Sequence, residues 1–246
     1  MMLGVLEGKK VLVTGGTRGI GAAVVKECVN AGAVVGFTYV ESEKEAKVLV
    51  RSFGGRAFSY RADTSDMEAM KQVAEEFSLK PGSPSIGGLV VNAGLYKRSS
   101  FRDLSRDDWD RTLSVNLGGA YTAVKAALPF IMDGSIVMVS SQLAHRGSAH
   151  GSDYAASKAG LLGLARSLAS DLAPGIRVNT ISPGYVDTDI IAGDTDEKRS
   201  SRELEVPVGR VGSPGEIARP IVFMLSDEAS YITGADLDVN GGLYIH

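Results

Sequence analysis

Three features are scarce in this sequence, and each scarcity excludes a class of protein. Cysteine occurs once, at Cys28, so no disulfide can form within the chain and a reducing compartment is expected. The apolar runs are too short to cross a bilayer, and the first ten residues lack the charged lead and apolar core of a secretion signal. Basic residues are not in excess, with 26 Lys and Arg against 29 Asp and Glu. The sequence therefore predicts a cytoplasmic protein that binds neither membranes nor nucleic acid.

The rest of the chain alternates between short β-rich runs and longer helical stretches. Several runs are apolar without polar alternation, which is typical of parallel strands covered by helices on both faces. The expected strands are Lys10–Thr14, Val34–Tyr39, Arg56–Arg61, Leu89–Asn92, Ser135–Ser140, Arg177–Ser182 and Ala235–Val239. Helices are expected over residues 20–31, 43–53, 66–77, 106–131, 152–171 and 215–225. This alternation predicts an α/β fold with a doubly wound parallel sheet of about seven strands flanked by helices.

Local signals refine this outline. Ser65 with Glu68, and Ser105 with Asp108, are pairs of a hydroxyl and an acid three residues apart, which predict helix starts. No stretch has the composition of a linker, so residues 1–246 are expected to form a single domain. Residues 185–210 are polar, charged and weakly periodic, and long loops in compact domains are usually lids or binding loops. We therefore expect a substrate loop near 185–210.

The first expected strand runs into a glycine-rich turn, Thr14–Gly21, and a helix follows. Glycines here allow a tight turn and let main-chain N–H groups approach a pyrophosphate at the positive end of the helix. The spacing is G-x-x-x-G-x-G, which differs from the common dinucleotide fingerprint G-x-G-x-x-G. The turn predicts a phosphate-binding site, and a helix entry without any ligand is the alternative.

The end of the second strand bears on the choice between NAD and NADP. An acid at this place would accept hydrogen bonds from both ribose hydroxyls and favour NAD. Tyr39 stands there instead, and Arg18 in the glycine turn could meet a ribose 2′-phosphate. The sequence therefore favours NADP, although Glu41 is close enough to repel a phosphate or to bind the ribose. A solvated Arg18 without a ligand is the alternative.

A third set of residues has the chemistry of a proton donor. Tyr154 and Lys158 are four apart in an expected helix and so share a face. A nearby ammonium group can stabilise a phenolate that otherwise forms only near pH 10. Ser141 follows the fifth expected strand, at the sheet edge where open α/β folds bind ligands. Asn116 lies in a helix between apolar neighbours, where a buried amide needs partners, and a purely structural role is the alternative.

In this order, these motifs resemble the short-chain dehydrogenase/reductase family over essentially the whole chain. The resemblance rests on T-G-G-T-R-G-I-G, N-A-G, Asn116, Ser141, Y-A-A-S-K-A-G and the later Pro-Gly pair. It implies a Rossmann-type fold and an NAD(P)-dependent interconversion of a ketone and a secondary alcohol. It also implies that Tyr154 is the proton donor or acceptor and that Ser141 binds the substrate oxygen. Lys158 would lower the pKa of Tyr154 and bind nicotinamide ribose, and Asn116 would hold a water that links Lys158 to solvent.

The resemblance also implies a set of cofactor-binding residues. Asp63 matches an acid that contacts adenine, and Thr188 matches a residue near the carboxamide. The expected cofactor-binding residues are Gly15, Thr17, Arg18, Gly19, Ile20, Gly21, Tyr39, Asp63, Asn92, Ala93, Gly94, Tyr154, Lys158, Pro183, Gly184 and Thr188. The whole chain is thus expected to be one dinucleotide-binding and catalytic domain.

Within the family, the C-terminal half most resembles the bacterial 3-oxoacyl-[acyl-carrier-protein] reductases. The supporting runs lie at residues 183–189, 208–212 and 231–242, and similar runs occur in sugar and steroid dehydrogenases. The carrier-protein reductases tend to carry basic residues before the fifth and sixth strands, whereas residues 132–135 and 173–175 contain none. A 3-oxoacyl thioester is therefore one expected substrate, and a sugar, a steroid or another small carbonyl compound is the alternative.

The sequence also bears on functional class, metals and assembly. A non-catalytic NADP-binding sensor or scaffold is the alternative from another functional class, although all four residues of the catalytic motif are present. No His, Cys or Asp cluster has metal-ligand spacing, so no metal is expected. Similar enzymes are commonly tetramers, so the resemblance implies a homotetramer.

Overall fold

The computed structural model describes residues 4–245, and its strands form one parallel sheet. The strands lie in the order β3-β2-β1-β4-β5-β6-β7. Their bounds are β1 Lys10–Val13, β2 Val34–Tyr39, β3 Ala57–Arg61, β4 Ile86–Val91, β5 Gly134–Val139, β6 Ile176–Pro183 and β7 Asp236–Val239. The predicted α/β fold with a doubly wound sheet of seven strands is confirmed.

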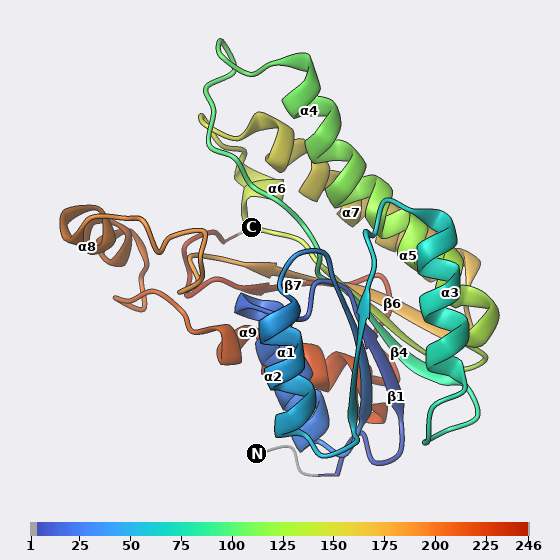
Figure 1. Ribbon diagram of the computed structural model, residues 1–246. Helices are drawn as coiled ribbons and strands as arrows, with labels where there is room; N and C mark the ends of the chain where they lie inside the picture. Colours follow the sequence, from blue (N-terminus) through green and yellow to red (C-terminus); the bar gives the residue numbers. More distant parts are fainter. Residues whose placement is uncertain (1–3, 246) are drawn as a thin grey trace.

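Helices cover both faces of the sheet, as the uninterrupted apolar strands predict (Figure 1). One face carries α1 (Gly19–Asn30), α2 (Glu43–Ser52) and α9 (Pro214–Leu225). The other carries α3 (Met67–Ser78), α5 (Gly119–Ala127) and α7 (Ser152–Asp171). Each layer buries its own hydrophobic cluster against the strands, so the sheet is held between two cores.

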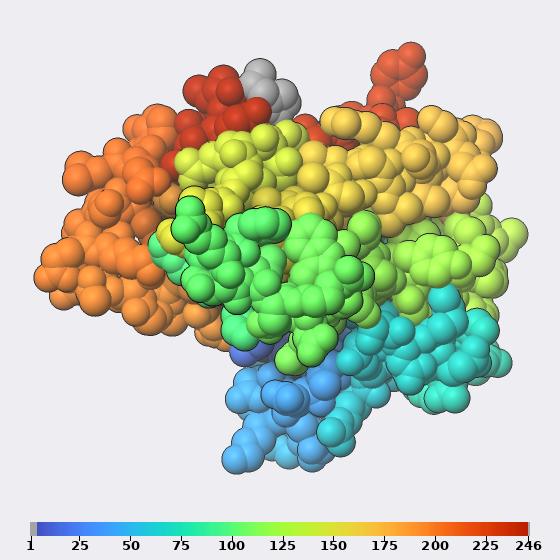
Figure 2. Space-filling model, turned by 90° about the horizontal axis from the view of Figure 1, so that it is seen from above, coloured from blue at the N-terminus to red at the C-terminus, as the bar shows by residue number. Residues whose placement is uncertain are grey.

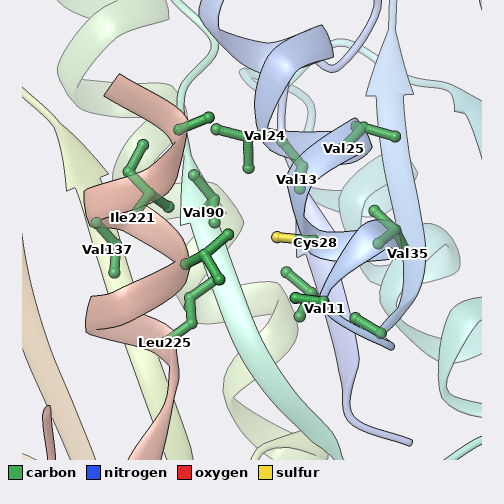
Figure 3. Packing of buried hydrophobic residues seen from close by; sticks show 14 of the residues in the cluster. Val11, Val13, Val24, Val25, Cys28, Val35, Val90, Val137, Ile221 and Leu225 are labelled. Atoms are coloured by element: carbon green, nitrogen blue, oxygen red, sulfur yellow. The ribbon is translucent and has the colours of Figure 1, made fainter. Parts of the chain in front are cut away.

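The core on the α1 side consists mainly of branched aliphatic side chains (Figure 3). Strand residues such as Val13 and Val90 face side chains of α1 and of α9, among them Val24 and Ile221. Cys28 lies fully buried in this cluster, and burial raises the pKa of its thiol far above the ordinary value. Cys28 therefore packs as a small hydrophobic residue, as expected.

The strand order places a crevice at the carboxyl edge of β1 and β4. From β1 the chain continues outward to β2 and β3, then returns to β4 on the other side of β1. The connections after β1 and β4 therefore diverge, which leaves an opening between them. The hydroxyl of Thr14 fixes this edge by accepting hydrogen bonds from the N–H groups of Asn92 and Ala93, each at 3.0 Å.

The expected helix over residues 106–131 is interrupted. It consists of α4 (Arg106–Leu113), a π-helical turn at Ser114–Gly118, α5 and a 3₁₀ turn at Leu128–Phe130. Two helices were not expected, namely α6 (Leu143–Arg146) and α8 (Asp196–Glu205), the latter inside the predicted substrate loop. Single π turns frequently mark functional sites, and this one contains Asn116.

One of the two predicted helix starts is correct. Ser105 caps α4, where its hydroxyl accepts from the N–H of Asp108 at 3.0 Å. The prediction for Ser65 is wrong, because Asp66 caps α3 and accepts from the N–H groups of Glu68 and Ala69. The Ser65 hydroxyl instead donates to Asp63 Oδ1 at 2.8 Å. Two neighbouring side chains could serve as the cap, and the carboxylate accepts from two N–H groups at once.

A buried polar cluster joins β7 to α6, next to the carboxyl edge. The Asp236 carboxylate accepts from the hydroxyl of Thr180 at 2.6 Å and from that of Ser182 at 2.8 and 2.9 Å. His145 Nε2 lies 2.7 Å from Oδ2 of the Asp236 carboxylate, and the His145 ring stacks on the Tyr244 ring. These contacts hold α6 against the last strand. Among residues 4–245, no helix is both long enough and apolar enough to span a membrane.

Candidate active site

A cleft of about 650 Å³ opens at the carboxyl edge of the sheet. Seen from above, the segment near residues 95–115 (green) lies against that near 140–150 (yellow), and residues 185–210 (orange) form one side (Figure 2). Every residue predicted to bind the cofactor lines this cleft, namely Gly15, Thr17, Arg18, Gly19, Ile20, Gly21, Tyr39, Asp63, Asn92, Ala93, Gly94, Tyr154, Lys158, Pro183, Gly184 and Thr188. Ser141 also lines it, whereas Asn116 is buried behind the wall.

The glycine turn presents the start of α1 to the cleft. Gly15 and Gly19 have φ values of +67° and +52°, a region that side chains disfavour. The cap residue of α1, Arg18, makes no side-chain hydrogen bond to the first turn, and that turn contains no acid. The N–H groups of the first turn of α1 are therefore left for an anion at the positive end of the helix. This arrangement fits the pyrophosphate of a dinucleotide.

Asn92 holds the glycine turn in this shape. Its amide donates to the carbonyl oxygens of Thr14 and Gly15 at 3.1 and 3.0 Å. A Cβ on Gly21 would lie only 2.0 Å from the Gly15 carbonyl oxygen, so the turn closes tightly on the helix. Asn92 thus shapes the site through the backbone of the turn as well as lining the cleft.

The far end of the cleft has mixed charge. Tyr39 ends β2, and both it and Glu41 line the cleft. The Arg18 guanidinium lies 3.2 Å from the carboxylate of Asp189, with both side chains largely exposed. An ion pair in solvent contributes little stability, so Arg18 can exchange this partner for a bound phosphate. The carboxylate of Asp63 accepts from Ser65 and faces the same end.

Tyr154 lies in the middle of the cleft wall, on the first turns of α7. Burial raises the pKa of its phenol to about 12, a hydrogen bond with Ser141 lowers it, and Tyr96 raises it. Ser141 itself is held in place because its Oγ accepts from the N–H of Leu143 at 3.1 Å. The two hydroxyls can therefore bind one oxygen atom from two sides.

Lys158 lies one turn further along α7 and is buried. Its Nζ donates to the carbonyl oxygen of Val139 at 2.7 Å and lies 5.6 Å from the centre of the Tyr154 ring. Burial lowers the pKa of Lys158 to about 8. The Ser140 hydroxyl donates to the Lys158 carbonyl oxygen at 3.0 Å and so fixes α7 against β5. A positive charge is thus held beside a phenol in a position where water is excluded.

Asn116 connects the π-helical turn to the segment after β4 and to α7. Its side-chain oxygen accepts from Leu95 N at 2.8 Å, and its amide donates to Leu95 O and to Ser157 Oγ, each at 3.0 Å. A Cβ on Gly94 would lie 3.2 Å from the Asn116 oxygen and 3.5 Å from Lys158 Nζ. Asn116 therefore approaches Lys158 from behind the cleft wall while it pins the loop.

Sequence reasoning missed Tyr96 and Tyr185. The Tyr96 ring contacts that of Tyr154 edge-to-face, with centroids 4.9 Å apart. The guanidinium carbon of Arg202 lies 4.5 Å from the centre of the Tyr185 ring, and the Tyr185 hydroxyl donates to the Glu205 carboxylate at 2.9 Å. These two contacts attach α8 to the end of β6. Neither residue stands in a repeated pattern, although each lies within five residues of the end of a strand, β4 for Tyr96 and β6 for Tyr185.

One possible metal-binding group was not visible in the sequence. His145, Asp236 and Asp238 offer ligand atoms within 4.8 Å of one another. They come from α6 and β7, far apart in the chain, so no spacing rule could find them. Because His145 and Asp236 already bind one another, as described above, we regard the group as a structural contact.

Known proteins resemble this chain over nearly its full length. A family model described as enoyl-(acyl carrier protein) reductase matches residues 15–244. The 3-oxoacyl-[acyl-carrier-protein] reductase FabG of Salmonella typhimurium is 37% identical over 243 residues, which cover 97% of this chain and 98% of that protein. The L-rhamnose 1-dehydrogenase (NAD(P)(+)) of Azotobacter vinelandii is 39% identical, with 97% of each chain covered.

The solved structures agree with these matches. The crystal structure of a short-chain dehydrogenase/reductase, glucose/ribitol dehydrogenase, from Brucella melitensis has a TM-score of 0.93 and is 32% identical, with 98% of each chain covered. A dehydrogenase/reductase from Sinorhizobium meliloti also reaches a TM-score of 0.93, at 35% identity over 100% of this chain and 99% of that one. The similarity thus includes the whole sheet and all segments around the cleft.

Proposed function

This chain belongs to the short-chain dehydrogenase/reductase family, and from that premise we propose that it reduces a 3-oxoacyl thioester with NADPH. The broader activity is that of the family: a nicotinamide-dependent oxidoreductase that interconverts a ketone and a secondary alcohol. The observation that carries the proposal is the group of Ser141, Tyr154 and Lys158 in the wall of the cleft. This group lies in the same cleft as the open start of α1, so the reacting oxygen and the dinucleotide can be held together.

The chain supplies binding and a proton, and the cofactor supplies the redox chemistry. A reduced nicotinamide, when bound, would supply the hydride for the carbonyl carbon. Ser141 and Tyr154 donate hydrogen bonds to the carbonyl oxygen and so orient the ketone. As the oxygen becomes an alkoxide, Tyr154 gives it the phenolic proton, and the product is the secondary alcohol. The ammonium of Lys158 stabilises the phenolate that remains.

The pKa of Tyr154 suits the role of a proton donor. Burial keeps the phenol protonated far above neutral pH, since its pKa is raised to about 12. An alkoxide is a much stronger base than a phenolate, so the proton transfer is still downhill. Lys158 would stabilise the phenolate that remains after the transfer, since its Nζ lies 5.6 Å from the centre of the Tyr154 ring.

Arg18 and Tyr39 support NADPH over NADH. Tyr39 occupies the end of β2 where an acid would bind both ribose hydroxyls. Arg18 has only an exposed ion-pair partner, Asp189, that a 2′-phosphate can replace. Glu41 lines the same end of the cleft and opposes a phosphate, so the expected preference is moderate.

A second candidate substrate is a sugar or another small carbonyl compound without a carrier protein. Met132 is 80% exposed at the place before β5 where carrier-protein reductases tend to carry basic residues. Residues 173–175 before β6 contain no basic residue, and Arg177 within β6 is used internally, since it donates to the carbonyl oxygens of Ile232 and Ser226. These two places therefore offer little to an acidic carrier. One of the similar proteins is named a rhamnose dehydrogenase.

A panel of carbonyl compounds tests the proposal. We expect acetoacetyl thioesters to be reduced, and NADPH to give a kcat/KM at least about tenfold higher than NADH, as one charge-assisted contact allows. The loss of reduced-cofactor absorbance is measured with acetoacetyl-CoA, diketones, aldehydes and keto sugars. Reduction of keto sugars alone would favour the second candidate. Tight NADPH binding without turnover on any compound would instead indicate a cofactor-binding sensor or scaffold.

We also propose that the protein acts in the cytoplasm as a homotetramer. The single cysteine is buried, which suits a reducing compartment. Large apolar side chains lie exposed at several places, among them Phe101, Leu204 and Val208, and further copies of the chain would cover them. Light scattering is expected to give a mass of about four chains, and a monomer at micromolar concentration would refute the tetramer.

A further inference from the structure

Tyr96 is the aromatic neighbour of Tyr154. It lies in the segment that follows β4, and its ring meets the Tyr154 ring edge-to-face, with 4.9 Å between centroids and 65° between planes. Aromatic pairs in this geometry attract one another beyond the area that they bury. Tyr96 also lines the cleft, so one side of its ring is available to a ligand while its edge contacts Tyr154.

The position of the Tyr96 ring is fixed from the opposite wall. Its hydroxyl donates to the carbonyl oxygen of His150 at 3.2 Å, and the same oxygen accepts from Ser99 N at 3.3 Å. A Cβ on Gly151 would lie 2.6 Å from Cε2 of Tyr96, so the ring fills the space that a side chain at 151 would need. Tyr96 thus spans two segments, the one after β4 and the one before α7, and is held at both.

Three side chains surround Tyr154, and Tyr96 covers one side of its ring. Ser141 bonds the Tyr154 hydroxyl, and Lys158 lies over the ring. Tyr96 packs beside it, with no space for a substituent between the two rings at this separation. A ketone whose oxygen binds Tyr154 must therefore place its substituent on that side against the Tyr96 ring.

We propose that Tyr96 positions Tyr154 and limits the size of the carbonyl substituent beside it. The inference rests on the proposed function, since it assumes that Tyr154 donates to a carbonyl oxygen. It narrows the substrate class to ketones that carry one small group, such as methyl, with the larger group directed away from Tyr96. An acetoacetyl thioester satisfies this requirement, and an aryl ketone with two large groups does not.

Three variants test the positioning and the size limit. Tyr96→Ala opens the space beside Tyr154, Tyr96→Phe keeps the ring, and Tyr231→Ala removes a fully exposed tyrosine as a control. For a methyl ketone, Tyr96→Ala is expected to lower kcat about tenfold, because the proton donor is no longer held. The ratio of kcat/KM for a phenyl ketone to that for the methyl ketone is expected to rise at least about tenfold. Tyr96→Phe should restore most of both values.

A pH profile separates positioning from a general loss of structure. Tyr96 raises the pKa of Tyr154, and opening the site admits water to the phenol, so in Tyr96→Ala the Tyr154 phenol should ionise at lower pH, which the phenolate absorbance measures against the same variant with Tyr154→Phe. Unchanged kcat, size ranking and pH profile in Tyr96→Ala would overturn the inference while reduction by the wild-type protein leaves the proposed function standing.

A stability measurement tests the contact without any turnover. The urea midpoints of Tyr96→Ala, Tyr154→Phe, Tyr154→Ala and the two double variants are compared at one protein concentration. Contact between the rings predicts non-additive shifts for the alanine pair and nearly additive shifts when position 154 retains a ring. If the wild-type protein reduces no ketone, the proposed function fails, and additive shifts for the alanine pair would then overturn the inference as well.

Discussion

Replacing Tyr154 with phenylalanine is expected to lower the turnover of ketone reduction at least about a hundredfold, the lower range for loss of a general acid. The substitution removes one oxygen and leaves the ring against Tyr96 and beneath Lys158. The carbonyl oxygen keeps the hydrogen bond of Ser141 but receives no proton as its charge develops. NADPH affinity should stay within about threefold, because the start of α1 is unchanged.

Steady-state turnover and NADPH binding by fluorescence check this expectation. Tyr121→Phe serves as the matched control, since Tyr121 is exposed on α5. Near-normal turnover in Tyr154→Phe would disprove the assignment of the proton donor. A parallel loss of NADPH binding would mean that the phenol acts through the cofactor site. Equal inactivity of the wild-type protein and the variant, with tight binding in both, would support a sensor or scaffold.

Most of the fold could be predicted because the central strands are apolar over most of their length. In β1 and β5 both faces of the sheet are buried, so runs such as Val11–Val13 have no polar alternation and stand out in the sequence. The same regularity placed Ser141, Tyr154 and Lys158. Each is fixed to the sheet edge by a strand end or by helical spacing, and the structure brings all three to one cleft. Their catalytic roles remain predictions until the variants are measured.

The parts that escaped prediction depend on contacts between distant segments. The role of Tyr96 depends on its contacts with Tyr154 and Gly151, which lie more than fifty positions away in the chain. The helix α8 has an exposed surface and no buried residue, so its sequence lacks the apolar stripe that reveals a helix. Asn116 was recognised as buried, but its partners Leu95 and Ser157 come from other elements. Local patterns could not identify these pairs.

Replacing Lys158 with methionine is expected to lower turnover about a hundredfold at neutral pH. Methionine has a similar length but brings no charge to the phenol and no donor to the carbonyl oxygen of Val139. The exposed Lys125→Met on α5 is the control and should retain wild-type turnover. Full activity in Lys158→Met would show that the Tyr154 phenol can donate its proton without the charge of Lys158.

The same substitution should remove a proton-linked term from the stability of the fold. Burial lowers the pKa of Lys158 from its ordinary 10.5 to about 8, so between these values the unfolded chain binds a proton that the folded protein lacks. Stability from this site therefore rises with pH across that window, while below pH 8 both states are protonated and the cost of burying the charge is constant.

The free energy of unfolding of the wild-type protein minus that of Lys158→Met should rise by about 2 to 3 kcal/mol between pH 8 and 10. Urea unfolding at one protein concentration measures it, at pH values below the range where Tyr154, with its pKa near 12, acts in the opposite direction. A difference that does not change with pH would mean that the ammonium of Lys158 is solvated in the folded protein, and the proposed stabilisation of a buried phenolate would have to be abandoned.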